Sequence, residues 1–122
     1  MEILIVDGSA QVTERLSSLL SEPDKGRKIH TALSFTDAMM LLNEKQPSLI
    51  LLDRWLPENK SIELLKIIKT KNNDTKVIIL YFFADGDTES HYKLHGADFF
   101  LDKYNDYEQI PGIIDSITSK LK

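Results

Sequence analysis

The chain has 122 residues, of which 42% are hydrophobic and 28% charged, as is typical of one globular domain and not of a disordered or fibrous chain. The formal net charge of -4 argues against binding to a phosphate backbone, and the absence of cysteine excludes disulfides, thiolate metal sites and cysteine nucleophiles. No secretory h-region follows Met1, and no apolar run approaches the roughly 20 residues of a membrane span. We therefore expect a single cytoplasmic domain over residues 1–122, with no direct contact to nucleic acid or membrane.

Apolar runs and helical repeats of apolar residues alternate in the first half of the chain. Runs rich in β-branched residues predict strands, and apolar residues three or four apart predict helices. In chain order we expect a buried strand over Glu2–Val6, a helix over about residues 10–21 capped by Ser9, a polar edge strand over Arg27–Leu33, a helix capped by Ser34 that ends before Pro47, and a buried run of four aliphatic residues that ends at Asp53.

The alternation continues in the second half. After a polar loop over Arg54–Lys60, we expect a helix built on the apolar residues between Ile62 and Ile68, a buried strand over Lys76–Phe83, a short polar helix over Thr88–His95, a strand over Ala97–Asp102 and a last helix over Ile110–Leu121. Gly96 is suited to end the short helix in a left-handed conformation. Pro111 fits the first turn of the last helix, where its missing N–H costs little.

Five strands alternating with five helices predict an α/β fold with right-handed crossovers and a doubly wound parallel sheet. The polar second strand belongs at an edge, which favours the strand order 2-1-3-4-5. In this order the chain reverses direction between the first and third strands, so Asp7 and Asp53 follow neighbouring strands. Lys103, directly after the fifth strand, can reach the same crevice. We therefore predict a site of two carboxylates and one lysine.

Two carboxylates at close range repel each other, and a cationic side chain or a hard divalent metal relieves the repulsion. A pocket with an acceptor carboxylate, Mg²⁺ and a lysine suits phosphoryl transfer, in which catalysis is mainly positioning and charge neutralisation. Asp53 would then accept the phosphoryl group. The alternative interpretation is structural, with Asp7 and Asp53 capping turns and Lys103 solvated.

Three motifs follow one another along the chain: Ile3-Leu4-Ile5-Val6-Asp7, Leu51-Leu52-Asp53-x-x-Leu56-Pro57 and Gly96-Ala97-Asp98-x-x-x-x-Lys103. In this order and spacing they resemble the receiver domain of two-component response regulators, and the similarity covers the whole chain. The resemblance implies a flavodoxin-like, non-enzymatic signalling domain. Its partners would be a histidine kinase or phosphotransfer protein and an effector domain or output protein, while homodimerisation stays open.

The resemblance also assigns roles to individual residues. Asp53 matches the phosphoacceptor, and Lys103 matches the lysine that stabilises the phosphoryl charge. Asp7 matches the first of two acidic residues, and with Asp53 and the backbone carbonyl of Trp55 it would hold Mg²⁺. Phe100 falls at the aromatic position whose rotamer changes on activation.

The sequence departs from the family pattern at several of these positions. Gly8 stands where the family has a second acidic residue, so Mg²⁺ is expected to bind more weakly. Tyr81 replaces the Thr or Ser at the switch position, and its phenol is large enough to fill the pocket instead. Ser61 or Lys60 replaces the glycine usual in the loop after the acceptor, and Tyr104 replaces the proline after the lysine.

Three functions stay open on this basis. The first is an atypical receiver that is phosphorylated on Asp53 and signals by conformational change. The second is a pseudo-receiver, a protein-interaction module that works without phosphorylation. The third is a flavodoxin-like cofactor binder that uses Gly8-Ser9 and Thr13 as a phosphate loop, although no glycine-rich motif supports it.

Overall fold

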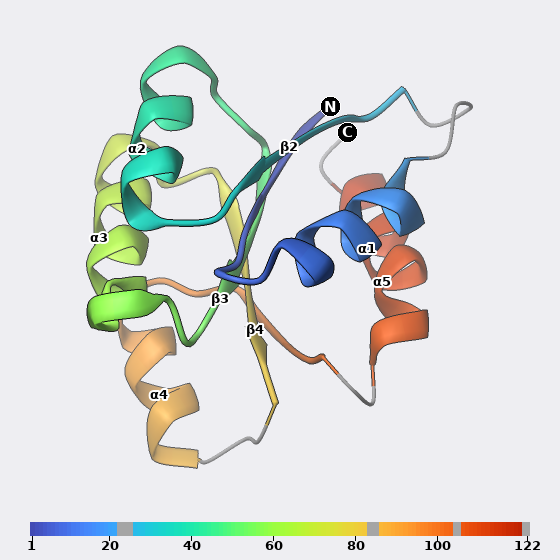
Figure 1. Ribbon diagram of the computed structural model, residues 1–122. Helices are drawn as coiled ribbons and strands as arrows, with labels where there is room; N and C mark the ends of the chain where they lie inside the picture. The colour runs from blue at the N-terminus through green and yellow to red at the C-terminus, as the bar shows by residue number, and fades with distance from the viewer. Residues whose placement is uncertain (22–25, 83–85, 104–105, 121–122) are drawn as a thin grey trace.

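The computed structural model describes residues 1–21, 26–82, 86–103 and 106–120, and it contains a five-stranded parallel sheet with helices on both faces (Figure 1). The strands are β1 (Glu2–Val6), β2 (Lys28–Ala32), β3 (Leu49–Asp53), β4 (Lys76–Tyr81) and β5 (Phe99–Asp102). Their order is β2-β1-β3-β4-β5, and neighbouring strands run parallel. The predicted fold class and strand order are confirmed.

Five α-helices connect and follow the strands. They are α1 (Ala10–Leu20), α2 (Phe35–Glu44), α3 (Ser61–Lys71), α4 (Gly86–Leu94) and α5 (Ile110–Lys120), with the 3-10 turns η2 (Pro57–Asn59) before α3 and η3 (Tyr107–Gln109) before α5. In Figure 1, α1 and α5 cover one face of the sheet, and α2, α3 and α4 cover the other. None of the helices in the described ranges combines the length and the apolar character of a membrane span.

Two predicted helix caps are present. The side-chain oxygen of Ser9 accepts a hydrogen bond from the N–H of Val12 at 3.3 Å, and that of Ser34 accepts one from the N–H of Asp37 at 3.1 Å. These bonds satisfy N–H groups that have no partner inside the helix. They fix where α1 and α2 begin, directly after the strands β1 and β2 have ended.

Some predicted boundaries are wrong by a few residues. β4 ends at Tyr81 although the apolar run continues, because the ring of Phe82 lies 4.8 Å from the Lys103 ammonium nitrogen and does not extend the ladder. β5 begins two residues later than predicted, because the N–H of Ala97 donates to the carbonyl of Tyr92 in the turn that ends α4. α4 begins earlier than expected, at Gly86, and the predicted element ends at Phe83 and Leu121 lie outside the described residues.

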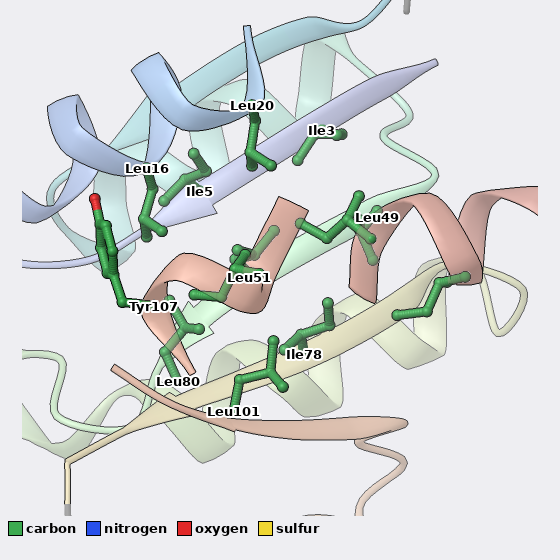
Figure 2. Close-up of a cluster of buried hydrophobic side chains, with 13 residues drawn as sticks. Ile3, Ile5, Leu16, Leu20, Leu49, Leu51, Ile78, Leu80, Leu101 and Tyr107 are labelled. Atoms are coloured by element: carbon green, nitrogen blue, oxygen red, sulfur yellow. The ribbon is translucent and has the colours of Figure 1, made fainter. Parts of the chain in front are cut away.

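Alternate residues of the central strands point to opposite faces of the sheet, so both faces carry an apolar cluster. Figure 2 shows the cluster that the sheet forms with α1 and α5. Its strand residues are Ile3, Ile5, Leu49, Leu51, Ile78, Leu80 and Leu101. The cluster on the other face packs against α2, α3 and α4 and contains the strand residues Leu4, Val6, Ala32, Ile50, Leu52, Val77 and Ile79. The carboxyl ends of the strands are therefore anchored from both sides.

Candidate functional site

Three predicted site residues meet at the carboxyl edge of the sheet. Asp53 is the last residue of β3, and Asp7 and Lys103 directly follow β1 and β5. The Lys103 Nζ lies 2.5 Å from Asp7 Oδ2 and 2.9 Å from Asp53 Oδ1. The exposed fractions are 2% for Asp7, 4% for Asp53 and 8% for Lys103. One buried ammonium group therefore bridges two buried carboxylates.

Backbone hydrogen bonds hold each of the three residues in place. Asp7 Oδ1 accepts from the N–H of Ser9 at 2.9 Å, and Asp53 Oδ1 accepts from the N–H of Trp55 at 3.1 Å. The N–H of Lys103 donates to the carbonyl of Tyr81 at 2.7 Å. The carboxylates are thus oriented by the turns that follow their strands, and the lysine by the neighbouring strand.

The charge at this site is not balanced. Two carboxylates and one ammonium leave a formal negative charge in a buried place. Burial raises the pKa of Asp7, the hydrogen bond from Lys103 opposes this rise, and the nearby Asp53 carboxylate adds to it. The site is therefore suited to receive a further positive charge.

Asp7 and Asp53 would supply oxygen ligands for such a charge, and the backbone of Trp55 lies in the turn directly after Asp53. Gly8 is exposed and contributes no third carboxylate. Across the part of the chain that the structure describes, no three His, Cys, Asp or Glu side chains form a metal-binding cluster. Two carboxylates suit a hard cation that completes its shell with water and substrate oxygens, as Mg²⁺ commonly does.

Tyr81 lies on the α4 side of the site. Its half-buried phenol has its pKa raised by burial and by the charges of Asp102, Asp106 and Glu89. Within the described residues, this phenol makes no hydrogen bond to either carboxylate of the site. Tyr81 lines a cavity together with Thr88 and Glu89 of α4 and Phe100 of β5.

Phe100 is the second predicted switch position. It pairs with Ile79 in the sheet, is half-buried, and its ring lies 5.8 Å from the Lys93 ammonium nitrogen. Phe100 and Tyr81 line one cavity of about 10 Å³, together with Arg54, Thr88 and Tyr92. A cavity of this size has room for about one water molecule.

The turn after Asp53 contains contacts that the sequence did not predict. The hydroxyl of Ser61 donates to the carbonyl of Asp53 at 2.6 Å, and the hydroxyl of Tyr92 donates to the carbonyl of Arg54 at 3.2 Å. The Arg54 guanidinium donates to the hydroxyl of Thr88 at 2.9 Å and lies 4.4 Å from the ring centre of Trp55. The only signal in the sequence was the hydroxyl residue in place of a loop glycine.

Two other residues singled out in the sequence are Thr13 and Tyr104. The hydroxyl of Thr13 donates to the carbonyl of Ala10 at 3.0 Å inside α1. Tyr104, the replacement for the proline after the lysine, lies outside the described residues.

Comparison with known proteins identifies the family. A family model described as "Response regulator receiver domain" matches residues 3–115. The chain belongs to the response regulator receiver domain family. Its receiver fold is of the kind found in two-component signalling proteins, and the predicted resemblance is confirmed.

Two curated relatives come from Bacillus subtilis. The transcriptional regulatory protein YdfI is 34% identical over 97 residues, which cover 80% of this chain and 43% of YdfI. The transcriptional regulatory protein MalR is 28% identical over 122 residues, which cover 100% of this chain and 52% of MalR. This receiver domain thus spans about half the length of these relatives.

Solved structures support the same fold. A two-component response regulator from Clostridium difficile superimposes with a TM-score of 0.90 at 20% identity, covering 100% of this chain and 98% of that chain. NtrX from Brucella abortus, solved in complex with ADP, superimposes with a TM-score of 0.85 at 26% identity, covering 98% of this chain and 28% of that chain.

Proposed function

We propose that this receiver domain accepts a phosphoryl group on Asp53 in a two-component phosphorelay and signals by the conformational change that follows. The observation that carries the proposal is the buried bridge that Lys103 forms between Asp53 and Asp7. Both bonds to the Asp53 side chain, from Lys103 and from the Trp55 N–H, go to Oδ1. Within the described residues Oδ2 receives no hydrogen bond, so it is the oxygen available to attack phosphorus.

The proposed reaction forms one bond and breaks one. Oδ2 of Asp53 attacks the phosphorus of a phosphohistidine on a histidine kinase or phosphotransfer protein, the P–N bond breaks, and an acyl phosphate forms on Asp53. The imidazole leaves with the electron pair of the broken bond. The Lys103 ammonium lies within hydrogen-bond distance of the carboxylate and neutralises charge on the transferred group.

Mg²⁺ is the cofactor that suits this site. Asp7, Asp53 and the backbone carbonyl of Trp55 would hold it, and the ion would neutralise charge on the phosphoryl oxygens. Gly8 removes one carboxylate from this ligand set, so we expect weaker binding than in a receiver with two adjacent acidic residues. The raised pKa of Asp7 favours the protonated acid, so binding weakens further as the pH falls.

The relatives suggest the partners. YdfI and MalR are transcriptional regulatory proteins about twice as long as this receiver domain. We propose that the domain is a cytoplasmic, non-enzymatic signalling module that acts on an effector domain or output protein and does not itself contact nucleic acid. Its net charge of -4 agrees with this division of roles.

The test is phosphorylation with acetyl phosphate and Mg²⁺, followed by mass spectrometry of the intact protein and by Trp55 fluorescence. Trp55 is the one tryptophan of the chain and follows Asp53 by two residues, so its emission reports on the site. We expect a mass increase of one phosphoryl group, which Asp53→Asn abolishes. The variant Gly8→Asp should lower the Mg²⁺ concentration that gives half the maximal rate.

One result would overturn the proposal. If neither acetyl phosphate nor a phosphohistidine donor modifies the wild-type chain at millimolar Mg²⁺, Asp53 is not a phosphoacceptor. The departures at Gly8 and Tyr81 would then favour the second function, a pseudo-receiver that binds partners without phosphorylation.

A further inference from the structure

The hydroxyl of Ser61 joins both ends of the turn that carries the site. Ser61 is the first residue of α3 and is 1% exposed. Its hydroxyl donates to the carbonyl of Asp53 at 2.6 Å and accepts from the N–H of Leu56 at 3.1 Å. Because a serine hydroxyl has one proton to donate, the donated bond fixes its orientation.

The middle of the same turn is held by other groups. The N–H of Arg54 donates to the carbonyl of Leu80 at 3.0 Å, and the carbonyl of Arg54 accepts from the Tyr92 hydroxyl at 3.2 Å. Burial raises the pKa of Tyr92 and an interaction with the Ser61 hydroxyl opposes the rise, so this phenol keeps its proton at neutral pH and is itself in contact with Ser61. The N–H of Trp55 donates to the Asp53 side chain at 3.1 Å.

These bonds leave the backbone carbonyl of Trp55 without a side-chain donor among the described residues. It lies between the two backbone groups that Ser61 holds. The Trp55 carbonyl and the Leu56 N–H belong to the same planar peptide unit and point in opposite directions, so the bond from the Leu56 N–H to Ser61 sets the direction of this carbonyl.

Position 61 does not have the left-handed backbone conformation that would favour glycine. The left-handed residues of this loop are Glu58, with a φ of 64°, and Asn59, with a φ of 55°, and both come before α3. The Ser61 hydroxyl bonds to the backbone of Asp53 and Leu56, which flank Arg54 and Trp55. What Ser61 adds over a smaller residue is therefore its hydroxyl.

We infer that Ser61 is a positioning residue for phosphoryl transfer. Its hydroxyl sets the orientation of the Trp55 carbonyl towards the cation and of the Asp53 carboxylate towards the phosphoryl donor. The inference rests on the proposed function and adds to it a residue that touches neither phosphoryl group nor metal. Groups that orient ligands and reactive side chains in this way typically contribute about 10-fold to 100-fold in metal affinity or activity.

The test compares Ser61→Ala with Thr75→Val. Both variants remove a buried hydroxyl that donates to a backbone carbonyl, because the Thr75 hydroxyl donates to the carbonyl of Pro47 at 3.3 Å. Three quantities are measured for each variant: the half-saturating Mg²⁺ concentration from Trp55 fluorescence, the maximal phosphorylation rate with acetyl phosphate, and the midpoint of thermal unfolding. Ser61→Thr keeps the hydroxyl and serves as the rescue variant.

For Ser61→Ala we expect the half-saturating Mg²⁺ concentration to rise, or the maximal rate to fall, by about 10-fold. Thr75→Val should leave both quantities unchanged at a comparable loss of unfolding temperature, and Ser61→Thr should restore them. Ser61→Gly removes the same hydroxyl and replaces Ser61→Ala if that variant does not fold.

Wild-type values for Ser61→Ala, or equal changes for Thr75→Val, would overturn the inference and leave the proposed function intact. The reverse case is also distinguishable. If the wild-type chain is not phosphorylated, the proposed function fails, whereas a weakened Mg²⁺ titration for Ser61→Ala would still show that Ser61 positions the cation ligands.

Discussion

Asp7 lies in unfavourable electrostatic surroundings. Its carboxylate is buried, lies near the Asp53 carboxylate, and relies on the Lys103 ammonium for compensation. A chain selected for stability alone would replace such a charge, whereas a chain selected to bind a cation would keep it. The residue therefore links the proposed activity to the stability of the fold.

Replacing the charge should make the fold more stable. We expect Asp7→Asn to raise the free energy of unfolding at pH 7 by roughly 1 kcal/mol, a common gain when a functional site is relaxed. Because folding raises the pKa of Asp7, the folded state binds the proton more tightly than the unfolded state does. The stability that Asp7 contributes is thus complete below its ordinary value of 3.8 and is lost as the pH rises through the raised value.

Urea unfolding at pH 7 and at pH 4 measures this effect. The gain from Asp7→Asn should be large at the higher pH and small at the lower one. Asp74→Asn, at an exposed aspartate, is the control and should change little at either pH. A less stable Asp7→Asn variant at pH 7 would contradict the electrostatic interpretation.

At the scale of single elements, the end of α4 depends on a glycine. Gly96 has a φ of 104°, as its place after the helix predicted, and a β-carbon at this position would lie 2.9 Å from Lys69 Cγ. The Lys69 ammonium is in turn held by the carbonyl of Thr75 and by the carboxylate of Asp98, each at 2.7 Å. The stem of Lys69 therefore has little freedom to give way.

Gly96→Ala should lower the free energy of unfolding by about 1 to 3 kcal/mol, because it adds a strained backbone conformation and a close contact. Gly112→Ala is the matched control, since Gly112 lies in α5 and a β-carbon there meets no atom within 4 Å. This control should raise stability by about 0.5 to 1 kcal/mol. Equal effects of the two substitutions in thermal unfolding would refute the account.

The sequence predicted those contacts that follow from the order of the strands, and it missed those that depend on how side chains pack. Asp7, Asp53 and Lys103 could be brought together from the sequence because parallel strands end at one edge of the sheet. The contact between Tyr92 and Arg54 could not, because it depends on how α4 packs against the turn after β3, which the strand order does not determine. The end of β4 was misplaced because the hydrophobic Phe82 covers the ammonium of Lys103 and not the core.

At the scale of the whole molecule, an ion pair joins the segment before the edge strand β2 to the last helix, α5. Arg27, just before β2, binds Asp115 of α5, and its guanidinium also donates to the carbonyl of Leu20 at 3.4 Å. The side chain of Arg27 is 3% exposed and that of Asp115 is 42% exposed. The arginine is thus the buried partner, and its charge depends on the aspartate.

Asp115→Ala should lower the free energy of unfolding by about 2 kcal/mol, because it leaves a buried guanidinium without its carboxylate. Glu63→Ala is the control, since it breaks the exposed pair with Lys60 at 3.0 Å, and it should change stability by less than about 1 kcal/mol. Chemical denaturation at low and high salt measures both variants. If Asp115→Ala and Glu63→Ala lowered the free energy of unfolding by similar amounts, and if high salt abolished both losses, Arg27 would not be buried as described.

The backbone bond between the N–H of Lys103 and the carbonyl of Tyr81 has a consequence for evolution. Because this bond involves no side-chain atom, any residue other than one that disturbs the strand can occupy position 81 and still present the same carbonyl. Mutation can therefore drift at position 81 without displacing the lysine. The bridge from Lys103 to Asp7 and Asp53 can therefore be inherited unchanged while the residue at position 81 varies.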